Sequence, residues 1–530
     1  MPRQPASARS QSLAVFLMKP GLGGYRDALK EPSKLTEFRF ASAVPFTGRL
    51  FLAPQRQALP GWLQFLQGGV HEELGRLLNT STSAVVVVEA AQRMFALTFG
   101  YGRAHLRQDA IERAFGLRIV LNSVDSKDGL RSLDTSTIQE LTVHTRRQAS
   151  RGSGLEVFGL DAQQDLLSAV TGTPLDQTLG RTITGSDAVQ FSPKIQFIDI
   201  GATCADLLKA YRRQDYKTRG FAFVDHMRTV ADPAIIDGLD ARLIAALVER
   251  DLSSIHMAPP EIVDWRDIEG FSYSPKADPA RDMDVAEFLA AIRKPDELTV
   301  ERLRRQPVYV HELKSQTAHD EWSVYNTLVA EFDLRGRHYV LTAGDWYEIE
   351  TDFVQRILGR IQRIPAGRLG LCTAARGERE GDYNARAARK RGVYLTDRKL
   401  IREGGSPIEL CDLYTSNKQF VHVKRWSASS TLSHLFAQGI TSAESFLWDA
   451  GFRDRAREML REQASALAAH VPQQRPQASS YQLVYAIITT KQRDWRRALP
   501  FFTQLHMARA AEHLSRLGFQ VAVERIGVEA

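Results

Sequence analysis

The pattern of apolar and polar positions is clearest in the last third of the chain. Residues 382–391 have helical spacing, and runs with strand character follow at 393–401, 408–414 and 419–426. A helix over 431–446, an apolar strand over 481–490, a helix over 502–517 and a strand over 519–526 complete the pattern. The predicted order of this region is therefore α-β-β-β-α-β-α-β.

In the rest of the chain, segments with helical spacing alternate with segments that have strand character. Residues 83–102 contain two β-rich runs around a polar turn, which predicts a hairpin, and a helix over 104–115 and a strand over 117–122 are expected next. Further strands are expected at 194–200, 328–334, 338–343 and 346–350, and helices at 202–213, 240–251 and 353–364. This alternation predicts a mixed α/β (α+β) fold.

A chain of 530 residues is too long for one hydrophobic core. We expect an N-terminal α/β domain over 1–150, a middle α/β region over 151–300, a small connecting region of sheet and helix over 301–374, and a C-terminal domain over 375–530. The polar segment 147–154 (RQASRGSG) is the expected flexible boundary after the first domain.

Composition excludes some classes of protein. Apolar residues make up 43% and charged residues 25%, as in an ordinary globular protein, and the longest apolar runs are too short to span a bilayer. Three cysteines without CxxC spacing argue against a zinc site or a disulfide framework. We therefore expect a cytoplasmic protein with no membrane partner.

Positive charge is modest but clustered. The net charge is +7, and basic segments occur at 144–151, 302–305, 386–391 and 491–497. Such segments are more often solvated surface than contacts to phosphate, so the charge permits a polyanionic partner without requiring one. The segment 386–391 leads directly into the most chemically suggestive part of the chain.

That part is residues 408–438. Side chains alternate between the two faces of a strand, so His422 and Lys424 are expected on one face. A hairpin turn at 416–418 would place Asp412 opposite or diagonal to His422, with their Cβ atoms about 5–8 Å apart. The pattern thus brings an acid, an imidazole and an ammonium group together at one edge of a sheet.

These residue types suit metal-assisted hydrolysis of a phosphodiester. Asp412 is a ligand for a hard cation such as Mg²⁺ or Mn²⁺, His422 is a second ligand, and Lys424 is placed to orient water or neutralise developing charge. Glu380, with Glu378 as the alternative, completes the cation shell, and Gln438 contacts the water or a phosphate. The same three residue types also arise by chance on hairpins whose polar side chains simply face solvent.

The order of motifs resembles the PD-(D/E)xK nuclease superfamily, especially its RecB-like branch. In that superfamily an acid on one strand is followed by Glu-x-Lys on the next and by a glutamine in the following helix. Asp412, Lys424 and Gln438 match this pattern, and Glu380 matches the acid of the first helix. His422 departs from it, and imidazole suits softer metals than Mg²⁺.

The resemblance implies a restriction-endonuclease-like α-β-β-β-α-β core in the C-terminal domain. It also implies nucleic-acid contacts from basic residues close to the site. The residues expected in this role are Arg386, Arg389, Lys390, Arg391 and Arg425.

The chain as a whole resembles a sporadically distributed bacterial family, a domain of unknown function found near mobile elements and defence genes. The stretches that carry this resemblance include FALTFGYGR, FGLRIVLN, SRGSG, IELCDL, FVHVKR and STLSHLFAQG. It implies a role in phage defence or in the control of mobile elements.

These observations predict a metal-dependent nuclease, with DNA favoured over RNA as substrate. Two alternatives stay open. One is a degenerate nuclease fold that only binds nucleic acid or a protein, and the other is a ribonuclease. The region before residue 375 is expected to act in recognition or regulation, with a possible protein partner.

Overall fold

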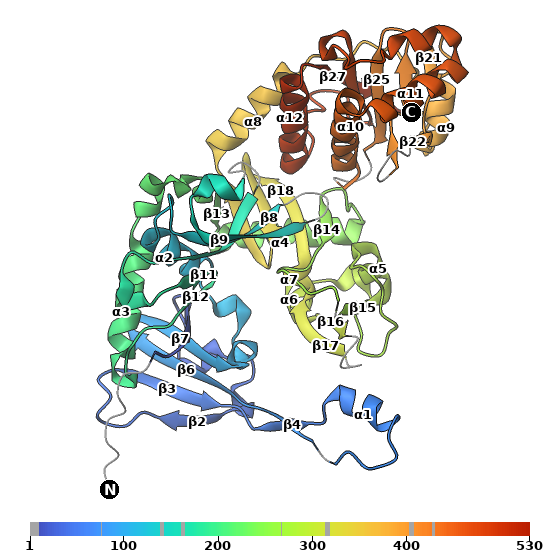
Figure 1. Ribbon diagram of the computed structural model, residues 1–530. Coiled ribbons are helices and arrows are strands. Elements are labelled where there is room, and N and C mark those ends of the chain that lie inside the picture. The colour runs from blue at the N-terminus through green and yellow to red at the C-terminus, as the bar shows by residue number, and fades with distance from the viewer. Residues whose placement is uncertain are drawn as a thin grey trace.

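The structure is a computed structural model that describes residues 10–75, 77–137, 142–160, 165–266, 268–312, 318–401, 407–426 and 430–529. Its sheets define an N-terminal unit (10–226), a middle unit (227–350) and a C-terminal unit (351–529). The C-terminal unit lies at the far end of the molecule from β2 and β3, whose bounds follow below (Figure 1). A multidomain α/β protein was expected, and the structure confirms this class.

The N-terminal unit is built on a ten-stranded antiparallel sheet of order β2-β3-β6-β7-β1-β12-β11-β10-β8-β9. The strands are β1 (Leu13–Leu17), β2 (Thr36–Arg39), β3 (Thr47–Leu52), β6 (Ser83–Ala90), β7 (Arg93–Gly100), β8 (Leu130–Thr137), β9 (Val143–Ser153), β10 (Asp165–Gly172), β11 (Ile183–Gly185) and β12 (Ala188–Phe191). Helices α2 (Phe115–Ser123) and α3 (Ile200–Arg212) pack against it. An excursion formed by β4 (Arg56–Ala58), α1 (Gly61–Gln67) and β5 (Asn79–Ser81) projects away from the sheet (Figure 1).

The predictions for this unit were partly right. The hairpin is confirmed as β6 and β7, and Ala91 and Gln92 form its turn with positive φ. The expected helix over 104–115 is instead two 3-10 turns, Gly102–His105 and Gln108–Ala110, followed by α2. The expected strand over 117–122 was wrong because it lies in α2, which is buried on nearly all sides and so has no polar face to reveal a helical period.

Two more expectations for this unit differ from the structure. Residues 194–200 are not a strand, because a 3-10 turn over Phe197–Asp199 leads directly into α3. The segment expected to be a flexible boundary, 147–154, lies mostly within β9, where backbone pairing with β8 holds it. The first sheet therefore continues past residue 150 as far as β12.

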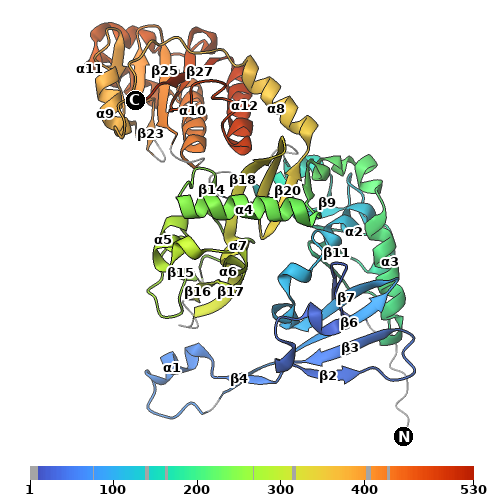
Figure 2. The ribbon, with the colours of Figure 1, turned by 180° about the vertical axis from the view of Figure 1, so that it is seen from behind.

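The middle unit contains two antiparallel sheets, β13-β20-β19-β18-β14 and β15-β16-β17. Their strands are β13 (Met227–Thr229), β14 (Ile255–Met257), β15 (Ile268–Ser272), β16 (Pro307–Glu312), β17 (Ala318–Ser323), β18 (Leu328–Leu334), β19 (Arg337–Thr342) and β20 (Asp345–Ile349). The helices are α4 (Pro233–Glu249), α5 (Val285–Ala291), α6 (Val300–Arg305) and α7 (Val324–Thr327), and α4 lies across β18 (Figure 2). The three strands expected between 328 and 350 are confirmed.

The C-terminal unit has a mixed sheet of order β21-β24-β25-β26-β27, in which β25, β26 and β27 are parallel and the other pairs antiparallel. Its strands are β21 (Val393–Leu395), β24 (Leu413–Thr415), β25 (Gln419–Arg425), β26 (Gln482–Ile488) and β27 (Gln520–Ile526), and β22 (Leu400–Ile401) pairs separately with β23 (Ile408–Glu409). The helices are α8 (Thr351–Arg363), α9 (Glu380–Ala387), α10 (Ser430–Trp448), α11 (Ala450–Gln463) and α12 (Phe501–Arg516).

The two faces of this sheet are covered by different helices. Val421, Val423 and Val484 pack with residues of α9, whereas Phe420 and Tyr485 pack with residues of α10 and α12.

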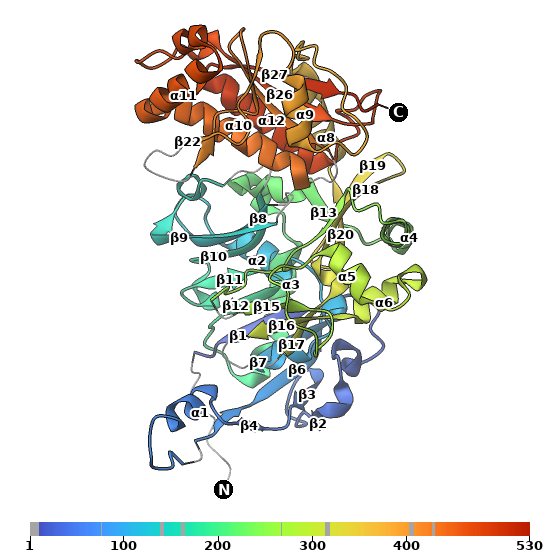
Figure 3. The ribbon, with the colours of Figure 1, turned by 90° about the vertical axis from the view of Figure 1, so that its right-hand side faces the viewer.

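In the part of the chain that the structure describes, no helix is long and apolar enough to cross a membrane. The C-terminal unit lies over β8 and β9 (Figure 3), and Leu166 of β10 packs against a hydrophobic cluster that the middle and C-terminal units share.

Candidate functional site

The candidate site begins at the hairpin of β24 and β25. Leu413 pairs with Val421 and Tyr414 with Phe420, and the N–H of Lys418 donates to the carbonyl of Thr415 at 3.0 Å. The expected turn is therefore present. The same register places Asp412 opposite His422, and the Asp412 N–H donates to the carbonyl of Val421 at 3.0 Å.

Asp412 belongs to a cluster of three acidic side chains. One carboxylate oxygen from each of Asp397, Glu409 and Asp412 lies within 4.8 Å of the others, and all three residues are partly buried. Asp397 follows β21, and its N–H donates to the carbonyl of Asp412 at 2.9 Å. Glu409 ends β23 and pairs with Leu400. We call these three residues the carboxylate cluster.

Burial and the closeness of the carboxylates raise the pKa of Asp412 and of Glu409. Burial raises the pKa of Asp412 to about 7, and the charges of Asp397, Glu409 and Glu380 add to this rise, while the hydrogen bond from the Val423 N–H at 2.7 Å opposes it. Burial also raises the pKa of Glu409, with a further contribution from Asp397. Like charges held this close favour a proton or a cation between them.

Helix α9 brings two further polar residues to the cluster. Glu380 is its first residue, and its carboxylate pairs with the Lys424 ammonium group at 3.1 Å. Asn384, one turn later, is buried, and its Nδ2 donates to Asp397 at 3.3 Å. Its Oδ1 is buried without a hydrogen-bond partner among the described residues. Lys424 also lies close enough to Glu409 to lower the pKa of that carboxyl.

Glu378, the alternative to Glu380, is engaged elsewhere. Its carboxylate accepts hydrogen bonds from Arg386 at 2.7 and 2.9 Å and from the N–H of Ala375 at 2.8 Å. The bonds from Arg386 hold the pKa of Glu378 below its usual range. Glu378 therefore fixes the start of α9, and Glu380 is the one that reaches Lys424.

His422 lies on the opposite side of the sheet from α9. Its side chain is buried, and its ring centre is 6.1 Å from that of Tyr485, whose hydroxyl donates to the Phe436 carbonyl of α10. Burial lowers the pKa of His422 to about 4, so the imidazole is neutral. The expected ligand thus packs beneath α10 and is not part of the carboxylate cluster.

Gln438 lies on α10 as expected, and its side chain is exposed. The side chain of Gln438 makes no hydrogen bond to any residue that the structure describes. Its neighbours Leu435 and Phe436 are the ones that enter the core. A contact of Gln438 with water or phosphate stays a prediction.

The five basic residues near the site fall into two groups. Three bind the protein's own groups: Arg386 pairs with Glu378, Lys390 donates to the carbonyls of Leu369 and Gly370 at 2.6 Å, and Arg425 donates to the carbonyl of Ala375 at 3.2 Å. The other two, Arg389 and Arg391, are exposed.

The arrangement fits a small divalent cation. Mg²⁺ and Mn²⁺ take oxygen ligands, and the cluster offers three carboxylates at a spacing that one ion can bridge. The unpartnered Oδ1 of Asn384 is a further oxygen beside Asp397. A bound cation would also offset the repulsion that raises the pKa of Asp412.

Sequence reasoning missed Asp397 and Glu409. The segments 393–401 and 408–414 were each interpreted as one strand, whereas each is two short strands with a break between them. The breaks let the chain turn so that Asp397 and Glu409 reach Asp412. Two features of the sequence could have pointed to these acids. Asp397 ends the sequence Leu-Thr-Asp at the end of an apolar run, and Glu409 stands three positions before Asp412.

Comparisons with known proteins identify the family but not an activity. No curated protein and no solved structure matches the chain significantly. One family model matches residues 13–527, which is nearly the whole chain. The protein therefore belongs to the family described as Family of unknown function (DUF6119).

Proposed function

We propose that the C-terminal unit is a metal-dependent nuclease that hydrolyses phosphodiester bonds of DNA. The observation that carries this proposal is the carboxylate cluster, with Lys424 held beside it by Glu380. Phosphodiester hydrolysis needs stabilisation of negative charge and a positioned water, and these residue types supply both.

Asp397, Glu409 and Asp412 would hold the cation, and Asn384 would position Asp397 from α9. The cation, Mg²⁺ or Mn²⁺, polarises the phosphate and lowers the pKa of water. Lys424 donates a hydrogen bond to the attacking water or to the phosphate oxygen that gains charge. Glu380 fixes the ammonium group of Lys424 in place at 3.1 Å.

In this proposal His422 only packs in the core. The sequence pattern predicted His422 as a ligand of the cation, and we propose the carboxylates of Asp397 and Glu409 as ligands instead. A neutral, buried imidazole beside Tyr485 is poorly placed to bind a hard ion. The departure of His422 from the nuclease motif then has no bearing on metal binding.

The order of elements supports the proposal. Helix α9, strands β21, β24 and β25, helix α10 and strand β26 occur in the order that the resemblance to the nuclease superfamily implies, with the short pair β22–β23 inserted after β21 and helix α11 inserted after α10. The antiparallel pairing of β24 with β25 and the parallel pairing of β25 with β26 bring Asp412 and Lys424 to one end of the sheet.

Arg389 and Arg391 are the residues that we propose contact the nucleic acid near the site, because both are exposed. Cys204, Cys372 and Cys411 are free thiols, which is in keeping with the cytoplasmic location that we propose. A role in defence or in control of mobile elements is part of the same proposal.

The proposal is tested by incubating the purified protein with labelled single- and double-stranded DNA and RNA in Mg²⁺, Mn²⁺ or chelator. We expect cleavage of DNA that requires the metal and falls by about 100-fold or more in Lys424→Ala and Asp412→Asn. Asp382→Asn is the matched control, since Asp382 is an exposed acid two residues after Glu380 on α9.

Three outcomes would contradict the proposal in different ways. Equal cleavage by Lys424→Ala, Asp412→Asn and the wild type would remove these residues from the mechanism. Binding without cleavage in every metal would favour the degenerate nuclease fold. Cleavage of RNA alone would identify a ribonuclease.

A further inference from the structure

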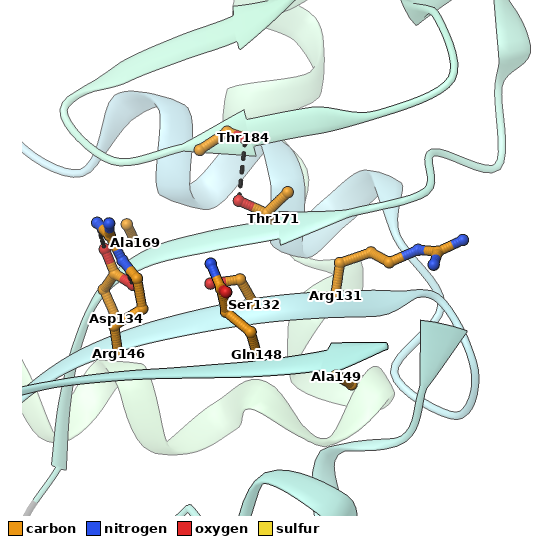
Figure 4. Close-up of a pocket in the computed structure, with 9 residues that line it drawn as sticks. All are labelled: Arg131, Ser132, Asp134, Arg146, Gln148, Ala149, Ala169, Thr171 and Thr184. Atoms are coloured by element: carbon orange, nitrogen blue, oxygen red, sulfur yellow. Dashed lines mark hydrogen bonds and ion pairs between the residues drawn. The ribbon is translucent and has the colours of Figure 1, made fainter. Parts of the chain in front are cut away.

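We propose that a polar hollow on the N-terminal sheet binds the sugar–phosphate backbone of a single nucleic-acid strand. The hollow, here called the sheet hollow, has a volume of about 420 Å³, and Figure 4 shows the side chains that line it. The inference rests on the proposed function, because it gives the substrate of the C-terminal unit a second binding site.

Strands β8, β9, β10 and β11 form the sheet hollow. Small or hydroxyl-bearing side chains make its floor, where Ser132 lies opposite Thr171 and the hydroxyls of Thr171 and Thr184 are 2.9 Å apart. The floor therefore offers hydrogen-bonding groups without bulky side chains above them. Hydroxyl groups and backbone edges of this kind commonly bind phosphate and sugar oxygens.

In the described part of the chain, helix α2 contacts β10 and β11 from one face of the sheet, and the hollow lies on the other face. The apolar side chains Leu133, Val170 and Ile183 point into the core that α2 and α3 close on the other side. Alternation along the strands then turns Ser132, Asp134 and their neighbours outward. The hollow is thus open to a ligand along the strand direction.

Two arginines stand at the ends of the hollow. Arg146 is fixed by Asp134 through hydrogen bonds of 2.6 and 2.8 Å, and Arg131 is exposed and points away from that pair (Figure 4). Strand β9 is the edge strand of the sheet and contains three arginines and no acidic residue. Asp134 of β8 also lines the hollow and offsets the charge of Arg146, so the two arginines and one aspartate of the lining leave a net charge of +1. Positive charge along an open edge is complementary to a polyanionic strand.

The side chains that line the hollow also determine which part of a nucleic acid it can bind. Among the described residues that line the hollow none is aromatic, and these side chains offer bases no surface on which to stack. Recognition would therefore be of the backbone, with weak dependence on base sequence and strong dependence on salt. A volume of about 420 Å³ fits a short stretch of sugar–phosphate backbone, and we therefore propose a single strand as the ligand.

The position of the hollow connects it to the C-terminal unit. Leu166 of β10 packs against the hydrophobic cluster that the middle and C-terminal units share, and Ala169, which lines the hollow, follows three residues later on the same strand. Three residues of a strand span about 10 Å. A nucleic-acid strand in the hollow therefore lies next to the junction with the C-terminal unit, as the position of β8 and β9 in Figure 3 also indicates.

The test measures binding apart from cleavage. The full-length protein is titrated into a fluorescein-labelled deoxyoligonucleotide in chelator, at several salt concentrations, and fluorescence anisotropy is recorded. Arg131→Gln and Arg146→Gln are expected to weaken binding by about tenfold and to reduce the salt slope by about one. Arg147→Gln is the matched control, because Arg147 is next in sequence but donates to the carbonyls of Phe158 and Gly159 at 2.9 Å.

Equal weakening in all three variants would overturn the inference, because it would reflect net charge rather than this face. Tighter binding of a duplex than of the single strand, or no binding by the wild type, would also overturn it. Arg131 is exposed, so Arg131→Gln keeps the test decisive even if Arg146→Gln unfolds. Because chelator is present, these results do not depend on metal binding by the carboxylate cluster. If the proposed role of the cluster is wrong, that would show only in the cleavage assay.

Discussion

Among single residues, Asp412 is the acid whose ionisation the site changes most. Burial and three neighbouring acids raise its pKa to about 7, from about 4 for an ordinary aspartate. Between those two values Asp412 keeps its proton in the folded protein but loses it in the unfolded chain. The contribution of Asp412 to the free energy of unfolding of the metal-free protein should therefore fall as pH rises from about 4 to about 7, by on the order of a few kcal/mol. The buried histidines His256, His422 and His506, whose pKa is lowered to about 4, contribute in the opposite direction.

Thermal unfolding in chelator at pH 5 and pH 8 measures this effect. We expect the wild type to lose stability relative to Asp412→Asn between pH 5 and pH 8, and to recover it when Mg²⁺ or Mn²⁺ is added. Because both proteins contain the same buried histidines, their difference in melting temperature isolates the carboxyl of Asp412. A difference that stays constant across this range, with or without metal, would contradict the raised pKa of Asp412.

His422 gives a second prediction at this scale. His422→Leu replaces a neutral, buried side chain by an apolar one of similar size, so it should leave the metal-induced rise in melting temperature within a few degrees of the wild type. Glu409→Gln should abolish that rise. The opposite result, loss in His422→Leu and retention in Glu409→Gln, would identify the imidazole as the ligand.

The sequence allowed part of this site to be predicted. The hairpin pattern located Asp412 and Lys424, because a turn at Ser416–Lys418 fixes the strand register on both sides of it. Asp397 and Glu409 could not be located in the same way, because their approach to Asp412 depends on breaks between short strands. Such breaks are set by contacts such as the bond from the Thr396 hydroxyl to the Cys411 carbonyl, which leave no periodic signal.

At the scale of elements, the packing of α2 shows why local pattern was sometimes misleading. Helices α9, α10 and α12 were predicted close to their observed positions, but α11 was not predicted. Helix α2 is buried on nearly every side, and its apolar run was interpreted as a strand. Its contact with β12 is so close that a Cβ added at Gly116 would collide with the carbonyl of Ala188.

Gly116→Ala should therefore destabilise the N-terminal unit strongly, by about 3 kcal/mol or more, because helix and sheet must move apart. The matched control is Gly359→Ala in α8, where a Cβ meets open space and the gain in helix propensity is expected to stabilise by up to about 1 kcal/mol. Denaturant unfolding compares the two. Similar effects of the two substitutions would contradict the close approach of α2 to β12.

Across the whole molecule, Arg113 joins the N-terminal and middle units. Its guanidinium bonds to Asp187 at 2.6 Å and to Asp345 at 2.5 Å, and it donates to the carbonyl of Ala343 at 2.9 Å. The group is largely buried, with 13% of the side chain exposed. Removing it takes the cation from Asp187 and leaves Asp345 with only the partly exposed Lys19, and breaking a buried ion pair in this way typically costs about 3–5 kcal/mol.

We therefore expect Arg113→Ala to lower the melting temperature and to speed proteolysis between the two units. Lys19→Ala is the control, because Lys19 also pairs with Asp345 but is 38% exposed, so its removal should cost less than about 1 kcal/mol. Equal sensitivity of the two variants to protease would argue against Arg113 as the main link.

In the proposed nuclease, Asp397, Glu409 and Asp412 together form the metal centre. We would first measure the rate of Mg²⁺-dependent DNA cleavage by Glu409→Gln relative to the wild type, with the melting temperature of both in chelator as the check on folding. We expect a loss of about 100-fold or more in a folded variant. Cleavage within about twofold of the wild type would contradict this proposal, since a loss of that size corresponds to less than about 0.5 kcal/mol of transition-state stabilisation.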